Sequence, residues 1–179
     1  MPTVLVLLAD GFEEIEAFAP VDLLRRANVE VTVACLNENR HATGRSGITA
    51  HADIGLEAVK DQSFDLLFLP GGAGVKHLRA DPRVRAIVER HHGEGRWLAA
   101  ICAAPTVLND AGLLAGKRYT AHFSVASELP MILAAERIVT DGKLTTSRGA
   151  GTAVEFGLHL VGLLTSPAQA AEISKAICF

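Results

Sequence analysis

Short apolar segments alternate with stretches of helical periodicity along most of the chain, and this alternation constrains the fold more than any other feature. The apolar segments are rich in valine and leucine, as is typical of parallel strands covered on both faces; they lie at 4–9, 29–36, 64–69 and 97–101. Helical stretches lie between and after them, at 13–27, 83–92, 103–111 and 153–164. Because strands that alternate with helices build parallel sheets, the sequence predicts an α/β fold with a mostly parallel, doubly wound sheet and helices on both faces.

Other elements are predicted from local signals. They are a short extended piece at 48–53, a brief helix at 56–60, a strand at 118–122, a helical stretch at 124–135, a hairpin at 137–147 with its turn at Asp141-Gly142, and a final helix after Pro167. Pro20 interrupts the first helical stretch and lacks the N–H that would bond the carbonyl of Glu16. We therefore expect a kink or a restart at Pro20.

Composition limits the classes of protein to which the chain can belong. Its 179 residues, 49% of them hydrophobic and 21% charged, predict a single globular domain over 1–179. A net charge of −3 argues against a nucleic-acid partner. The first apolar segment, six residues without a basic leader, is too short for a signal peptide or a membrane span. Three widely spaced cysteines suit a reducing compartment, so the sequence predicts a cytoplasmic protein without a membrane partner.

A cysteine occupies the turn between the strand at 97–101 and the helix that follows it. Ala100 and Ala104 flank Cys102 at two residues' distance, and their small side chains allow the sharp strand-to-helix turn of a nucleophile elbow. The unpaired N–H groups of the helix start would favour a thiolate there. The alternative is that Cys102 is a small buried hydrophobe, as most free cysteines are.

Several polar or glycine-rich positions follow directly after predicted strands. In a parallel sheet the carboxyl ends of the strands share one edge, where active sites lie. The sequence therefore gathers on one rim Asp10-Gly11, Gly71-Gly72, Cys102, His122 and Arg148.

Each candidate partner of Cys102 has two interpretations. The N–H groups of Gly72 and Ala103 can face an oxyanion, or the glycine can simply end a strand. Glu16 can be a buried general acid–base with a raised pKa, or one of several acidic residues that complement a helix start. His122 can orient or deprotonate the thiol, or be structural. No pair of histidines or cysteines has metal-ligand spacing, so no metal or cofactor is predicted.

Four segments resemble the ThiJ/PfpI superfamily, and within it the branch of the Parkinson disease deglycase protein and its bacterial homologues. They cover nearly the whole chain in the right order and spacing; they are 8–16, 69–72, 99–105 and 146–152. The resemblance implies a flavodoxin-like sandwich and a homodimer. It also implies glyoxalase III activity, which converts methylglyoxal to lactate without glutathione, a deglycase activity on glycated amines, and peroxide-sensing and chaperone roles.

The resemblance also implies roles for individual residues. Cys102 matches the oxidation-sensitive nucleophile, and Glu16 matches the carboxylic acid bonded to it. Gly72 and Ala103 match the backbone donors, and His122 matches the nearby histidine. Asp22 and Arg26 match a pair at the dimer interface, whose arginine reaches toward the partner's pocket. Arg148 is expected to support the pocket.

The sequence departs from the family pattern at two places and differs from the protease-like branch at a third. Ala150 stands where relatives often carry proline, which predicts a looser loop, and Ser46 stands near the position of an arginine, which puts a second anion contact in doubt. Ala103 replaces the histidine that the protease-like branch carries after its cysteine, which argues against peptidase activity.

These observations lead to a primary hypothesis and two alternatives. The primary one is a cofactor-independent, cysteine-dependent enzyme acting on methylglyoxal, glyoxal or their adducts with thiols and amines, as in protection against oxidative stress. One alternative is a redox sensor or chaperone in which Cys102 oxidises to a sulfinate with little turnover. The other is a non-catalytic dimeric scaffold with an inert cysteine.

Overall fold

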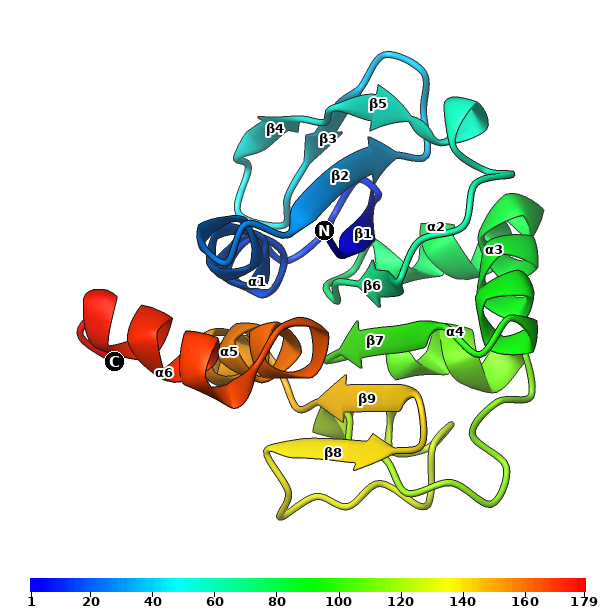
Figure 1. Cartoon of the computed structure of the whole chain (residues 1–179). Coiled ribbons are helices and arrows are strands. Elements are labelled where there is room, and N and C mark those ends of the chain that lie inside the picture. The colour runs from blue at the N-terminus through cyan, green and yellow to red at the C-terminus, as the bar shows by residue number, and fades with distance from the viewer.

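A computed structural model describes residues 1–179 as one sheet with helices on both faces (Figure 1). The sheet has seven strands in the order β5-β2-β1-β6-β7-β9-β8, and every neighbouring pair is parallel except β8 and β9. A separate two-stranded antiparallel hairpin pairs β3 with β4. The strands are β1 Thr3–Leu8, β2 Glu30–Cys35, β3 His41–Thr43, β4 Thr49–His51, β5 Ile54–Gly55, β6 Leu66–Leu69, β7 Trp97–Ile101, β8 Ile138–Asp141 and β9 Leu144–Ser147. This architecture confirms the predicted α/β class.

Six α-helices cover the two faces of the sheet. Three of them, α1, α5 and α6, pack on one face, and α2, α3 and α4 pack on the other (Figure 1). Their bounds are α1 Glu14–Arg26, α2 Val75–Ala80, α3 Pro82–Gly93, α4 Pro105–Asp110, α5 Ala153–Leu164 and α6 Pro167–Ala176, with single 3₁₀ turns at Leu56–Ala58, Phe123–Val125 and Ala150–Thr152. None of the helices combines the length and the apolar character that crossing a membrane requires.

The side chains of β1 explain why helices are needed on both faces. Val4, Val6 and Leu8 point into the core under α1 and α5, whereas Leu5 and Leu7 point into the core under α3 and α4. Successive side chains of a strand face opposite sides of the sheet, so a continuous apolar run is buried only when both sides are covered.

The order of the strands places the functional rim. The chain moves from β1 to β2 in one direction and then crosses back to β6 and β7 on the other side of β1. The loops after β1 and β6 therefore leave the sheet side by side, at the switch point where open α/β sheets bind ligands. They are tied together by a bridge between Phe12 and Gly72 and by hydrogen bonds from Glu13 N to Gly71 O (3.0 Å) and from Gly74 N to Gly11 O (2.8 Å).

Two predicted elements between β7 and β8 are wrong. Residues 118–122 form no strand, because both edges of β9 are already paired, with β7 and β8. The backbone N–H of Thr120 instead donates a hydrogen bond to Thr146 Oγ1 (2.9 Å). Residues 124–135 contain no α-helix beyond the turn at Phe123–Val125. Pro130 contributes to this, since it lacks an N–H and disfavours helical geometry in the residue before it.

Two further expectations need smaller corrections. The hairpin turn lies one residue later than predicted, because Asp141 pairs with Leu144 and leaves Gly142 and Lys143 as the loop. The Asp141 carboxylate accepts hydrogen bonds from Arg118 N (3.0 Å) and Lys117 Nζ (3.1 Å). In α1 the helix does not restart at Pro20 but runs without interruption from Glu14 to Arg26. Packing of this helix against α5 outweighs the one hydrogen bond that proline removes.

Candidate active site

Cys102 occupies a strained turn directly after β7. Its φ of +65° lies in the left-handed region, which non-glycine residues rarely adopt and which is common at functional sites. Two hydrogen bonds hold the turn, from Cys102 N to Ser147 O (3.0 Å) and from His122 N to Cys102 O (2.8 Å). The thiol is thus fixed at the rim by the segments that follow β7 and β9, which is the elbow that the sequence predicts.

Glu16 reaches this thiol from the first turn of α1. The side chain is 1% exposed, and the helix start is fixed by the Glu13 carboxylate, which accepts a hydrogen bond from Glu16 N (2.7 Å). A Cβ built on Gly71 would overlap both Glu16 Oε2 and Cys102 Cβ. The carboxyl and the cysteine side chain therefore approach each other over the bare Cα of Gly71, and the thiol lies within hydrogen-bonding range of the carboxyl.

Two backbone N–H groups lie beside the sulfur atom. They belong to Gly72 and Ala103, and both lower the pKa of the thiol. Gly72 adopts φ +96°, and a Cβ there would lie 2.6 Å from Glu13 N, so only glycine fits this turn. Donors in these positions can also stabilise an oxyanion that forms beside the sulfur.

Burial changes the acidity of both side chains. It raises the pKa of the Glu16 carboxyl to about 7. Burial also raises the pKa of the Cys102 thiol to about 12, with the negative charge of Glu16 and its hydrogen bond acting in the same direction. The sequence attributed thiolate character to the N–H groups of the helix start. The N–H of Ala103, just before α4, does lower the pKa of the thiol, but burial and Glu16 outweigh it.

Groups in such close contact titrate together, so the two pKa values describe the pair. Between about pH 7 and about pH 12 the pair holds one proton and one negative charge. Backbone N–H groups lower the pKa of both partners: Gly72 and Ala103 act on the thiol, and Gly71 and Ala150 act on the carboxyl. One buried proton is therefore shared between Glu16 and Cys102.

His122 lies beside the pair. Its Nδ1 accepts a hydrogen bond from Ser124 N (3.2 Å), so the proton of the neutral ring is on Nε2. The Phe123 ring packs against the imidazole with centroids 4.1 Å apart and an interplanar angle of 35°. Near the carboxyl, a Cβ on Gly149 would contact both His122 Cδ2 (3.4 Å) and Glu16 Oε1 (3.8 Å). The imidazole therefore stands at the rim with an N–H available to a bound molecule.

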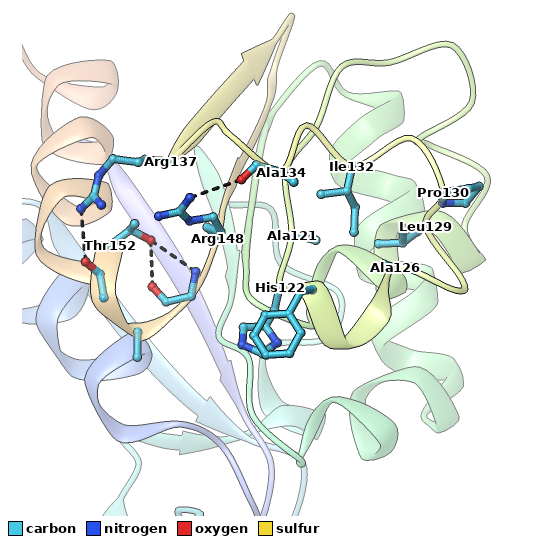
Figure 2. A pocket seen from close by; sticks show the side chains of 14 residues that line it. Ala121, His122, Ala126, Leu129, Pro130, Ile132, Ala134, Arg137, Arg148 and Thr152 are labelled. Atoms are coloured by element: carbon cyan, nitrogen blue, oxygen red, sulfur yellow. Dashed lines mark hydrogen bonds between the residues drawn. The ribbon is translucent and has the colours of Figure 1, made fainter.

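His122 lines a cavity of about 650 Å³ (Figure 2). Its walls include Phe123, Leu129 and Ile132 from the irregular segment after His122, and the loop after β9 closes it. Arg148, which belongs to that loop, donates to Ala134 O (3.2 Å), as Figure 2 shows, and lines the cavity without an acidic partner. Cys102 and Glu16 do not line this cavity, so it adjoins the thiol site rather than containing it. The sequence marked Arg148 and its loop, but no motif marked Phe123, Leu129 or Ile132.

The remaining candidates lie away from the thiol. Asp22 and Arg26 form a half-exposed ion pair (2.7 Å) near the end of α1. Arg26 is ten residues beyond Glu16, roughly 15 Å along the helix, so within one chain it is remote from the site. Ser46 donates its backbone N–H to Glu14 Oε1 (2.8 Å), and Ala150 opens the 3₁₀ turn after β9. No group of three or more histidine, cysteine or acidic side chains is placed to hold a metal ion.

A parallel α/β sheet with a cysteine at a strained elbow and a buried carboxyl against it defines a class of thiol proteins. Residues 2–163 match the model of the DJ-1/PfpI family, and the chain belongs to this family. The protein dj-1beta of Drosophila melanogaster is 36% identical over 97% of this chain and 95% of its own length, and its crystal structure superposes with a TM-score of 0.96 over 99% of this chain and 97% of that one.

Two other relatives bear on chemistry. A deglycase of Thermococcus kodakarensis is 31% identical over 90% of this chain and 98% of its own length. Oxidized Toxoplasma gondii DJ-1 superposes with a TM-score of 0.95 at 33% identity, covering 100% of this chain and 99% of that one. Some relatives are much longer, since the chain spans 41% of DJ-1 homolog B of Arabidopsis thaliana.

Proposed function

We propose that the chain is a cofactor-independent thiol enzyme that acts on methylglyoxal, glyoxal or the adducts they form with thiols and amines. The observation that carries the proposal is the pairing of the Cys102 thiol with a buried carboxyl whose pKa is about 7. A group with this pKa both donates and accepts protons efficiently near neutral pH. The similarity to a deglycase of Thermococcus kodakarensis supports the choice of substrates.

The geometry supports a sequence of steps for methylglyoxal. Sγ of Cys102 adds to the aldehyde carbon, and the carbonyl oxygen takes up the proton of Glu16 to give a hemithioacetal. The N–H groups of Gly72 and Ala103 stabilise the oxyanion as it forms. Glu16 then removes the proton from the former aldehyde carbon and passes it to the ketone oxygen to give an enediol. It next takes the hydroxyl proton of the sulfur-bearing carbon and returns it to the neighbouring carbon, leaving a lactoyl thioester. Water hydrolyses the thioester, which releases lactate and restores the thiol.

His122 and the cavity suit the rest of the substrate. The Nε2 proton of His122 can hydrogen-bond to a substrate oxygen, since Nδ1 is occupied by Ser124. A cavity of about 650 Å³ is far larger than a three-carbon dicarbonyl requires, and its apolar wall and Arg148 can hold the side chain that carries an adduct.

Lactate production tests the mechanism. Cys102→Ser and Glu16→Gln are each expected to abolish formation of lactate from methylglyoxal, because one lacks the nucleophile and the other lacks the titrating proton. Met131→Ala, on an exposed side chain that does not line the cavity, is the control that retains activity. Wild-type turnover by either site variant would overturn the mechanism.

A second function rests on the same pair. A thiolate beside a carboxylic acid is open to oxidation, and a relative of known structure, Toxoplasma gondii DJ-1, is described as oxidized. In this role Cys102 becomes a sulfinate held by Glu16, Gly72 and Ala103. Intact mass after mild peroxide checks it: two added oxygens on the wild type and none on Cys102→Ser are expected, and an unmodified wild type would contradict it.

We also propose that the chain acts as a homodimer in the cytoplasm. Ile15 and Phe18 on α1 and Ile48 on the neighbouring loop are large exposed apolar side chains. The backbone N–H of Ser46 bonds Glu14, which places this loop against the start of α1. The Asp22–Arg26 pair lies further along the same helix, where the arginine can extend toward a partner's pocket. Three free cysteines suit a reducing compartment.

A further inference from the structure

The small hairpin outside the main sheet carries two facing histidines. His41 begins β3 and His51 ends β4, and the two residues are direct partners in the antiparallel register. Directly opposed side chains on one face of such a pair have Cβ atoms roughly 4.5–5.5 Å apart, close enough to share a ligand. Both side chains are exposed, and their ring centroids are 4.8 Å apart at an interplanar angle of 68°.

One hydrogen bond fixes which nitrogen of His41 is free. Nδ1 of His41 lies 2.7 Å from the backbone carbonyl oxygen of Asn39, and because a carbonyl only accepts, Nδ1 carries the proton. The other nitrogen, Nε2, therefore presents its lone pair, and it lies 3.3 Å from Nδ1 of His51. A backbone carbonyl that holds the distal N–H of a histidine in this way is the usual outer support of a metal-ligating imidazole.

The separation of the two nitrogens matches a tetrahedral metal ion. With Zn–N distances of about 2.0–2.1 Å and a tetrahedral angle, two coordinated nitrogens lie roughly 3.3–3.4 Å apart. The observed separation between His41 Nε2 and His51 Nδ1 is 3.3 Å. A metal ion would take the place of the single proton that now lies between the two nitrogens.

We propose that His41 and His51 chelate one divalent cation that prefers imidazole, with Zn²⁺ as the best fit. No third histidine, cysteine or acidic side chain completes the set, so water fills the other positions and the ion exchanges readily. The sequence missed the pair because ligands ten residues apart have no motif spacing; only the hairpin register brings them together. The site is separate from the Cys102–Glu16 pair and is independent of the proposed enzyme activity.

Zinc titration of the full chain by calorimetry tests the site. The wild type is expected to bind an ion that His41→Ala and His51→Ala each bind at least about tenfold more weakly, because either change leaves a single imidazole. His92→Ala, on an exposed histidine of α3, is the matched control and is expected to bind as the wild type does. Zinc bound by cysteine thiols would bind equally to the wild type and to all three variants. That result is therefore distinguishable from binding by the two histidines.

A second measurement does not depend on the variants. Nitrogen NMR of the imidazoles in the wild type is expected to show zinc-induced shifts at His41 Nε2 and His51 Nδ1, with the other five histidines unchanged. Unchanged affinity in both histidine variants, an equal loss in His92→Ala, or the absence of shifts at these two nitrogens would each overturn the proposal.

Discussion

The carboxyl of Glu16 and the side chain of Cys102 meet over the Cα of Gly71, where any larger residue would separate them. The acid comes from the first turn of α1 and the thiol from the turn after β7, so their contact depends on the glycine that follows β6. The pairing of acid and thiol therefore depends on the strand order of the sheet.

Gly71→Ala is therefore expected to disrupt the pair. The added methyl group would overlap Glu16 Oε2 and Cys102 Cβ and would lie 2.8 Å from the backbone oxygen of Ile101, so the side chains must move apart. We expect lactate formation to fall about 100-fold, the scale of losing a positioned acid–base. Gly93→Ala, where a methyl group meets nothing within 4 Å, is the control. Equal activity of the two variants would show that the contact is dispensable.

The pH dependence of alkylation reports where the shared proton lies. If the carboxyl holds it, the rate of Cys102 alkylation by iodoacetamide rises through an apparent pKa of about 7 and then levels off. A rate that keeps climbing toward pH 12 would instead place the proton on sulfur. Cys102→Ser supplies the background from Cys35 and Cys178.

Glu16→Gln separates positioning from proton transfer. The glutamine amide can donate a hydrogen bond to the thiolate as the protonated carboxyl does, but it cannot take up or release a proton. At about pH 8, roughly one unit above the pKa of the Glu16 carboxyl, alkylation of Cys102 is expected to persist. Lactate formation is expected to drop about 100-fold or more. Loss of both together would point to a structural role for Glu16.

The cavity beside His122 predicts a dependence on substrate size. Ile132→Trp is expected to fill part of the cavity and raise KM for adducts on a peptide side chain, while kcat and KM for methylglyoxal stay near wild type. Met131→Trp, on the exposed neighbouring residue, should leave both substrates unaffected. A parallel loss for small and large substrates in Ile132→Trp would show that the cavity does not receive the adduct.

Much of the site follows from the sequence because strand ends are readable. The apolar runs before Asp10, Pro70 and Cys102 end abruptly, and parallel strands bring such ends to one rim. The approach of Glu16 to Cys102 could not be predicted in this way, since it depends on a bare glycine Cα between the first turn of α1 and the turn after β7. The resemblance to known relatives suggested that pair, whereas periodicity alone left Glu16 as one of several acidic residues at a helix start.

The strand and the helix predicted between Arg118 and Arg137 are absent for a physical reason. Its apolar residues lack a clear period, and its backbone groups bond to side chains and turns rather than to a ladder or a helix, as Thr120 shows with Thr146, Leu133 and Glu136. Much of the cavity wall belongs to this segment, so the size of the cavity could not be predicted from the sequence. The facing pair His41 and His51 was missed because it depends on register.

His91 predicts how stability depends on pH. It lies on α3 and is fully buried against Phe64, with Nδ1 bonded to Ile87 O (2.9 Å) and Nε2 accepting from Phe64 N (3.3 Å). Burial lowers the pKa of His91 below its ordinary value of 6.5. Below that value the unfolded chain binds a proton that the folded chain resists, so stability is full above about pH 6.5 and falls as pH drops toward the folded pKa.

Urea unfolding at several pH values measures this contribution. The wild-type midpoint is expected to fall between pH 7.5 and pH 5.5, and His91→Gln should remove part of that fall, because the amide stays neutral at both values while retaining hydrogen-bonding groups. These two pH values lie about one unit above and below the ordinary pKa of histidine. His92→Gln, on the exposed neighbour, is expected to keep the wild-type slope. An identical pH slope in wild type and His91→Gln would show that His91 is not the group that resists protonation.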